Sequence, residues 1–164
     1  MKNIIISIVC IAFISIVIYF SYLSGQKYQS VKLNGSIETC TIMTRGSDVI
    51  CSFTIDGKNE TRRLSKPHNY IKSNEMYNVY YWDKIPDTYY ISWTEPVIIE
   101  NEYTETITES FSKNGTRLTF TYIVNGIVFE RIQEISDEII INPKKEYKVL
   151  FKKEDPEIAY VVSL

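Results

Sequence analysis

The sequence SFTIDGKNETRRL, residues 52–64, has a second, altered copy in TYIVNGIVFERI, residues 121–132. A shift of 69 residues places Asp56-Gly57 on Asn125-Gly126. Both dipeptides tolerate the positive φ angles of the type I′ turn, a tight turn that joins antiparallel strands. Each segment is therefore predicted to be a β-hairpin.

The strand that leads into each turn alternates apolar residues with hydroxyl-bearing ones, which is the period of a half-buried β-strand. The apolar positions are Cys51, Phe53 and Ile55 in the first copy, and Phe120, Tyr122 and Val124 in the second. One face of each strand is thus predicted to lie in a core and the other in water.

A second pair of segments matches in the same order. Residues 77–92 (YNVYYWDKIPDTYYIS) align with residues 147–162 (YKVLFKKEDPEIAYVV) at a shift of 70 residues. Any two β-rich stretches can share turn residues, but two matches in the same order favour a duplication. Turn residues at 45–47 and 113–115 add an earlier hairpin to each copy.

Each copy therefore has about five predicted strands. Beyond the arms of the Asp-Gly and Asn-Gly hairpins, these lie near residues 36–43, 77–82 and 89–93, and near residues 104–111, 147–152 and 159–164. We predict an all-β chain of two tandem small antiparallel β-barrel or sheet modules, residues 27–98 and 99–164. A module of about 65 residues buries only a modest core, so we expect the modules to pack together or to close into barrels.

The composition supports a β-rich chain without a nucleic-acid partner. A hydrophobic content of 45% excludes wholesale disorder, and Ile, Val, Thr, Tyr and Phe, which suit a pleated surface, are frequent. The 18 Lys and Arg residues are scattered and balanced by 20 Asp and Glu, for a net charge of −2. A protein that binds phosphate backbones would carry a basic face.

Residues 4–23 (IIISIVCIAFISIVIYFSYL) carry no charge. About 20 such residues in a helix cross roughly 30 Å of hydrocarbon, so residues 1–26 are predicted to be a transmembrane anchor. A buried core helix would show polar residues at helical spacing, and only three serines interrupt this run. A cleaved signal peptide is the remaining alternative, although the run is longer than the apolar core of a usual signal peptide. Cys10 is interpreted as a small apolar filler.

The orientation of the anchor is set by few charges. Lys2 on one side faces Lys27 and Lys32 on the other, and the very short N-terminal tail favours a cytoplasmic N-terminus. The chain is thus predicted to be a single-pass membrane protein with its bulk outside the cytoplasm. Tyr19 and Tyr22 are then expected in the outer interfacial belt.

Each copy combines the Asp-Gly or Asn-Gly hairpin with an aromatic-x-Val-x-aromatic strand and a proline turn. The segments are FTIDGKNE (53–60) and YNVYYWDKIPDTYY (77–90), and YIVNGIVF (122–129) and YKVLFKKEDPEIA (147–159). They resemble the bacterial domain-of-unknown-function family 3592. That family often has a glycine shortly before the late strand, where this chain has KSNE (72–75) and NPKK (142–145). The resemblance implies a membrane-associated bacterial β domain without established catalytic residues.

The reactive side chains predict no enzyme, no metal site and no cofactor. The single histidine, His68, lies in a loop segment without a cysteine or carboxylate at ligand spacing. The chain has no G-x-S-x-G nucleophile motif and no Gly-rich phosphate loop. Asp83 and Asp87 lie in a turn, where Asp commonly forms local hydrogen bonds.

Outward aromatic residues mark a predicted interaction surface. If Val79 faces the core, Tyr80 and Trp82 point outward, where the second copy has Leu150 and Lys152. The predicted surface consists of Tyr80, Trp82, Tyr89 and Trp93. Exposed Trp and Tyr often mark recognition surfaces, and the alternative is that these residues form the seam between the modules.

These features favour a membrane-anchored extracytoplasmic module that binds a protein and carries out no reaction. The alternative is an accessory protein that neutralises a toxin or serves an envelope complex by occlusion. A neighbouring toxin gene would distinguish the two.

Cys40 and Cys51 lie symmetrically about the turn at Arg45-Gly46, so a loop of even length would place them opposite one another. Directly opposed residues at a non-hydrogen-bonded pair have Cα atoms about 4.5 Å apart, which a disulfide tolerates. A two-residue loop makes this a less suitable hydrogen-bonded pair, and a three-residue loop breaks the opposition. The sequence thus leaves two outcomes, a disulfide or two buried thiols.

Overall fold

The computed structural model describes residues 2–65, 69–85, 87–142 and 145–162, with the backbone alone for residues 2–9, 11 and 65. The elements are α1 (Lys2–Asn34), β1 (Ser36–Arg45), β2 (Asp48–Ile55), β3 (Lys58–Ser65), β4 (Met76–Tyr81), β5 (Tyr89–Pro96), η1 (Glu100–Glu102), β6 (Tyr103–Asn114), β7 (Arg117–Val124), β8 (Ile127–Glu134), β9 (Lys148–Lys152) and β10 (Ala159–Val162). By contacts the chain divides into a helical unit, Met1–Ile37 with Tyr80–Tyr90, and a β unit, Glu38–Val79 with Ile91–Leu164. The secondary structure is mostly β, as the sequence predicts.

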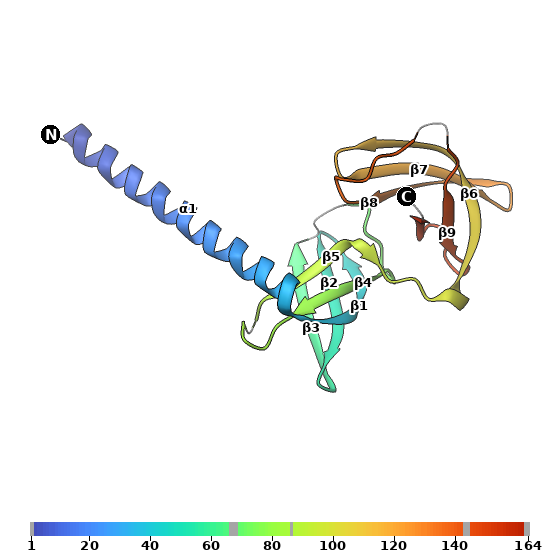
Figure 1. The fold of residues 1–164 in the computed structure, drawn as a ribbon, viewed down its shortest axis with the longest axis horizontal. Coiled ribbons are helices and arrows are strands. Elements are labelled where there is room, and N and C mark those ends of the chain that lie inside the picture. Colours follow the sequence, from blue (N-terminus) through green and yellow to red (C-terminus); the bar gives the residue numbers. More distant parts are fainter. Residues whose placement is uncertain (1, 66–68, 86, 143–144, 163–164) are drawn as a thin grey trace. The chain divides into compact units, whose positions relative to one another are not determined.

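The described strands form two five-stranded sheets with the same strand order. The first runs β3-β2-β1-β4-β5, and the second, read from its other edge, runs β8-β7-β6-β9-β10 (Figure 1). Numbering β6 to β10 as β1 to β5 makes the two orders identical, which is the result that a duplication predicts. The predicted module boundary after residue 98 falls between β5 and η1.

One hairpin in each sheet is closed by a type I′ turn. Asp56 and Gly57 have φ angles of 49° and 75°, and Asn125 and Gly126 have φ angles of 51° and 79°. Both central residues of each turn therefore lie in the left-handed region that a type I′ turn requires. The two predicted hairpins are confirmed.

The earlier hairpins turn through two-residue loops, Gly46-Ser47 and Gly115-Thr116. Each loop begins with a glycine, whose φ is 60° at Gly46 and 59° at Gly115. A glycine with positive φ in first position is typical of a type II′ turn. The first loop lies inside the predicted turn, and the second begins at the last residue of its predicted turn.

The second sheet curls around its own core (Figure 1). Its buried apolar residues are Leu118, Phe120, Tyr122, Val124, Ile135, Tyr147, Val149, Phe151, Ala159 and Val161. A bulge in β6 shifts the register between Thr108 and Ser110. Because the extra residue reverses the alternation, Thr108 before it and Phe111 after it both turn toward the core.

One side chain joins the two edge strands of the curled sheet. Gln133 on β8 is only 7% exposed. Its Oε1 accepts a hydrogen bond from the backbone N–H of Val161 on β10 at 2.8 Å, and its Nε2 donates to the carbonyl of Val161 at 3.5 Å. The amide of Gln133 therefore satisfies backbone groups that would otherwise lie unpaired at a sheet edge.

The buried residues of the first sheet follow the predicted alternation. They include Cys40, Ile42, Val49, Cys51, Phe53, Tyr77, Val79 and Ile91. The inward face predicted for the late strand from Val79 is therefore confirmed.

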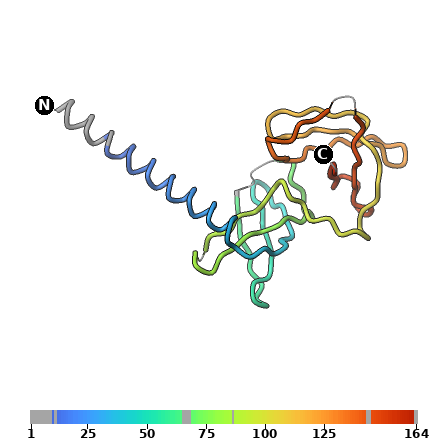
Figure 2. Tube along the Cα trace, in the orientation of Figure 1, coloured from blue at the N-terminus to red at the C-terminus, as the bar shows by residue number. Residues whose placement is uncertain are grey.

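Helix α1 extends beyond the predicted anchor. It continues without interruption from the apolar run to Asn34, and Figure 2 traces its described part in blue. Among the residues whose side chains are described, no helix is long and apolar enough to cross a membrane. The side chains of residues 4–9 and 11, which belong to the predicted span, lie outside that description.

Candidate functional site

A buried ion pair lies inside the β unit. Arg131 on β8 is 3% exposed, and Glu75, which directly precedes β4, is fully buried. The Nη2 of Arg131 pairs with Oε1 of Glu75, and its Nη1 donates to the backbone carbonyl of Tyr70. The hydroxyl of Tyr77 donates to Oε2 of Glu75 at 2.7 Å. Both oxygens of the buried carboxylate therefore have partners, as a desolvated charge requires.

Burial governs the titration of this cluster. Loss of solvent raises the pKa of Glu75, although Arg131 and the hydroxyl of Tyr77 act in the opposite direction. Burial also raises the pKa of Tyr77 and of Tyr160 well above the ordinary value for tyrosine. The arrangement thus holds a carboxyl group, a guanidinium and phenols in a region of low dielectric constant.

Backbone hydrogen bonds to β1 fix the segment that carries Glu75. The N–H of Ile42 donates to the carbonyl of Glu75, and the N–H of Asn74 donates to the carbonyl of Ile42, both at 2.8 Å. Asn74 adopts a φ of 68°, a left-handed conformation that asparagine tolerates better than most residues. This local turn positions Glu75 facing inward.

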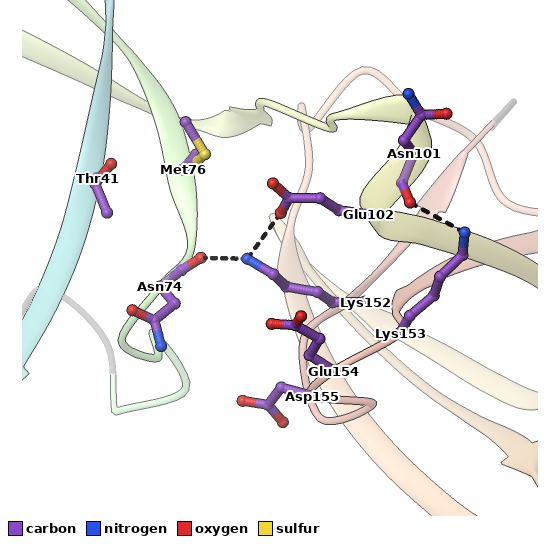
Figure 3. Close-up of a pocket in the computed structure, with 9 residues that line it drawn as sticks. All are labelled: Thr41, Asn74, Met76, Asn101, Glu102, Lys152, Lys153, Glu154 and Asp155. Carbon is purple, nitrogen blue, oxygen red and sulfur yellow. Dashed lines mark hydrogen bonds and ion pairs between the residues drawn. The ribbon is translucent and has the colours of Figure 1, made fainter.

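A cleft of about 740 Å³ opens beside this segment (Figure 3). Its lining comes from β1, from the start of β4, from η1 and from the end of β9 with the turn after it. The lining residues are Thr41, Asn74, Met76, Asn101, Glu102, Lys152, Lys153, Glu154 and Asp155. Met76 is the single apolar side chain in this set.

Lys152 organises the centre of the cleft. Its Nζ pairs with Oε2 of Glu102 at 3.1 Å and lies 3.5 Å from the carbonyl oxygen of Asn74 (Figure 3). Its side chain is 15% exposed, compared with 43% for Glu102. The Nζ of Lys153 donates to the carbonyl of Asn101 at 3.0 Å. Both lysines of the cleft thus contact other residues of its lining.

The described residues contain no group of three or more His, Cys, Asp or Glu side chains that could hold a metal ion. His68 lies outside the described residues. The lining of the cleft offers lysine, carboxylate and amide groups for polar and ionic recognition.

The four aromatic residues of the predicted interaction surface are all partly buried. Tyr80, Trp82 and Tyr89 belong to the helical unit, and Trp93 belongs to the β unit. Lys84 Nζ lies 5.3 Å from the ring centre of Trp82.

Two of these rings pack against other tyrosines. The ring of Tyr80 lies 5.7 Å from that of Tyr90, and the ring of Trp93 packs edge-on against Tyr77 at 5.1 Å. The role of the four residues in binding stays a prediction.

Of the two outcomes left open for Cys40 and Cys51, the structure has two buried free thiols. The turn is centred one residue later than the symmetric placement required, so Cys51 lies opposite Ile42. Cys40 is then its diagonal neighbour on the same face, a position less suited to a disulfide. A hydrogen bond with the Cys40 thiol, together with burial, raises the pKa of the Cys51 thiol.

Neither the ion pair nor the cleft is predicted by the sequence. Arg131 was detectable in part, because it occupies a core-facing position opposite Phe120 and a charge there needs a partner. The identity of that partner was not detectable, because Glu75 lies far from Arg131 in the sequence. The cleft draws its residues from segments that only the fold brings together.

No protein-family model matches the chain, and no curated protein or solved structure matches it either. The resemblance of the two modules to family 3592 therefore stays a prediction.

Proposed function

We propose that this chain is a membrane-anchored binding module, without catalytic activity of its own, that holds a protein partner in the cleft around Lys152. The observation that carries the proposal is the composition of the cleft. Eight of its nine lining residues are polar or charged, and the central lysine is held by Glu102.

Sites for small organic molecules are lined mainly by apolar and aromatic side chains with a few polar groups. The lining of this cleft instead resembles the polar parts of protein–protein interfaces, where hydrogen bonds and charge complementarity give specificity. A partner segment with both acidic and basic side chains would complement Lys152 and Lys153 on one hand, and Glu154 and Asp155 on the other.

The membrane anchor is part of the proposal. The uncharged residues 4–23 continue into a single helix, and its described part exposes consecutive large apolar side chains. Those from the middle of the run are Phe13, Ile14, Ile16, Val17, Ile18 and Phe20. Exposed apolar surface on every side of a helix favours a lipid environment. Lys2 precedes the run and Lys27 and Lys32 follow it, and we propose a cytoplasmic N-terminus and an extracytoplasmic β unit.

Site-specific photo-crosslinking in native membranes tests the binding site. A photoreactive amino acid at Asn101 should capture a specific protein, whereas the same group at Lys58, an exposed residue outside the cleft, should not. Glu154→Lys should abolish capture from Asn101, because it reverses a charge in the cleft.

The matched control is Glu130→Lys, the same reversal at an exposed carboxylate outside the cleft, which should leave capture unchanged. Equal capture from both crosslinker positions, or capture that survives Glu154→Lys, would refute the proposed site.

A further inference from the structure

The C-terminal end of α1 is docked within the helical unit. Val31 is fully buried although it lies on a helix whose other described residues are mostly exposed. The N–H of Gly35 donates to the carbonyl of Val31 at 2.8 Å and so closes the helix. The segment Tyr80–Tyr90 belongs to the same compact unit.

At Gly35, the backbone that follows α1 lies close to the backbone of Tyr81. A Cβ atom at this position would lie 2.4 Å from the carbonyl oxygen of Val31 and 2.5 Å from that of Tyr81. The φ of Gly35 is not in the left-handed region. The glycine is therefore required for space between two backbones and not for an unusual backbone angle.

Aromatic contacts also connect the C-terminal end of α1 to the segment Tyr80–Tyr90, and we call this connection the joint. Lys32 Nζ lies 5.2 Å from the ring centre of Tyr90, within the range of a cation–π interaction. The ring of Tyr90 packs in turn on Tyr80 at 5.7 Å. The segment Tyr80–Tyr90 is thus contacted at two positions, by Lys32 of α1 and by Gly35, which directly follows α1.

We infer that α1 and the hairpin end Tyr80–Tyr90 move as one rigid body. Residues 24–35 then form no flexible linker between the apolar run of α1 and this hairpin. The inference does not depend on what the cleft binds.

Distance measurements between two spin labels test the joint in the full chain, solubilised in detergent. The labels are placed at Lys27→Cys on α1 and at Asp83→Cys in the hairpin, with Cys10→Ser to remove the exposed thiol and with Cys40 and Cys51 left buried. A rigid joint predicts one narrow distance distribution. A broad distribution in the chain with native Gly35 would overturn the inference.

Two alanine substitutions give a matched pair. Gly35→Ala should abolish the narrow peak, because the added methyl group collides with two carbonyl oxygens. Gly25→Ala should preserve it, because nothing lies within 4 Å of a Cβ at that position. If Gly35→Ala prevents folding, the variant Lys32→Gln is measured instead, and it should broaden the distance distribution. An unchanged peak in whichever of these two variants folds would overturn the inference.

Discussion

Arg131 occupies a position where the strand pattern predicts an apolar side chain. It lies directly opposite Phe120, which is 1% exposed. A guanidinium keeps its charge when buried, so it needs a partner of opposite charge in the interior. Glu75 supplies that charge. The cost of removing one partner is then expected to exceed the net contribution of the pair itself.

We predict that Arg131→Met lowers the free energy of unfolding by about 3–5 kcal/mol, because it leaves Glu75 buried and unpaired. The double variant Arg131→Met with Glu75→Leu should regain most of this loss. Arg62, the corresponding residue of the first copy, is a matched control. Its pair with Glu60 is about one-third exposed, so Arg62→Met should cost about 0–1 kcal/mol.

Chemical denaturation of the full chain in mild detergent measures all three variants. Equal destabilisation by Arg131→Met and Arg62→Met would show that the buried pair has no special role.

We predict that the free energy of unfolding falls in strong base, because Tyr103 and Tyr122 lose their protons there. Burial raises the pKa of each phenol to about 12, from an ordinary value of 10.0. Because the folded-state pKa is raised, the folded chain keeps these protons at a pH where the unfolded chain has lost them. This contribution to stability is complete below pH 10.0 and is lost as the pH rises through about 12.

Phenolate absorbance and circular dichroism, followed through the same titration, measure this effect. A step near pH 12 should accompany the loss of β structure, and the double variant Tyr103→Phe with Tyr122→Phe should reduce the absorbance of that step. Complete ionisation of every tyrosine well below pH 12 with the fold intact would contradict the assignment.

The edge strands β3 and β8 carry charged or polar side chains on their inward faces. In β3, Arg62 lies opposite Cys51 and Glu60 lies opposite Phe53, so both charges share a face with core residues. Inward-pointing charges on an edge strand oppose pairing with another chain. In β8, the inward Gln133 pairs with the backbone of β10 instead. The corresponding edge strands of the two copies thus protect their edges in different ways.

The counterpart of Gln133 in the first copy is Leu64, so Gln133→Leu introduces the residue type of the first copy. We predict a loss of about 1–3 kcal/mol in unfolding free energy, because the N–H and C=O of Val161 lose their partner. Hydrogen exchange of the Val161 amide should accelerate. Glu130→Leu, at an exposed position of the same strand, should leave both quantities nearly unchanged. Unaltered exchange in Gln133→Leu would show that its side chain does not close the sheet.

The strands and turns were predictable because their signals are local. Asp-Gly, Asn-Gly and the alternation of side chains specify hairpins within a few residues. The sequence left the register of β1 on β2 open, because several turn residues lie next to each other around Gly46. The bulge near Thr108 left no signal in the alternation that the sequence analysis used. Pairing between distant segments, as for Glu75 and Arg131, depends on the fold.

At the scale of the whole molecule, one strand order appears in both sheets while the side chains have diverged. Arg62 pairs with Glu60 of its own strand, whereas Arg131 pairs with Glu75, which precedes β4 of the first sheet. The duplication that we propose would therefore have been followed by a change of partner. One copy has an ion pair that is about one-third exposed, and the other has a buried pair that ties residues of both sheets within the β unit.

The last prediction concerns the side of the membrane on which the C-terminus lies. Residues 4–23 form the one uncharged stretch of this length, and no later run could return the chain across a membrane. With a cytoplasmic N-terminus, everything after residue 26 would lie outside the cytoplasm. Alkaline phosphatase, which is active only after export, should therefore be active when fused to the C-terminus of the full chain.

The same fusion without residues 1–26 is the control, and it should be inactive because it lacks the segment that directs export. Washing membranes at alkaline pH should leave the full-length fusion in the pellet, since an integral helix resists extraction that removes peripheral proteins. A cleaved signal peptide would instead give an active fusion in the soluble fraction. A cytoplasmic reporter that works at the C-terminus, with an inactive phosphatase at the same place, would refute the orientation.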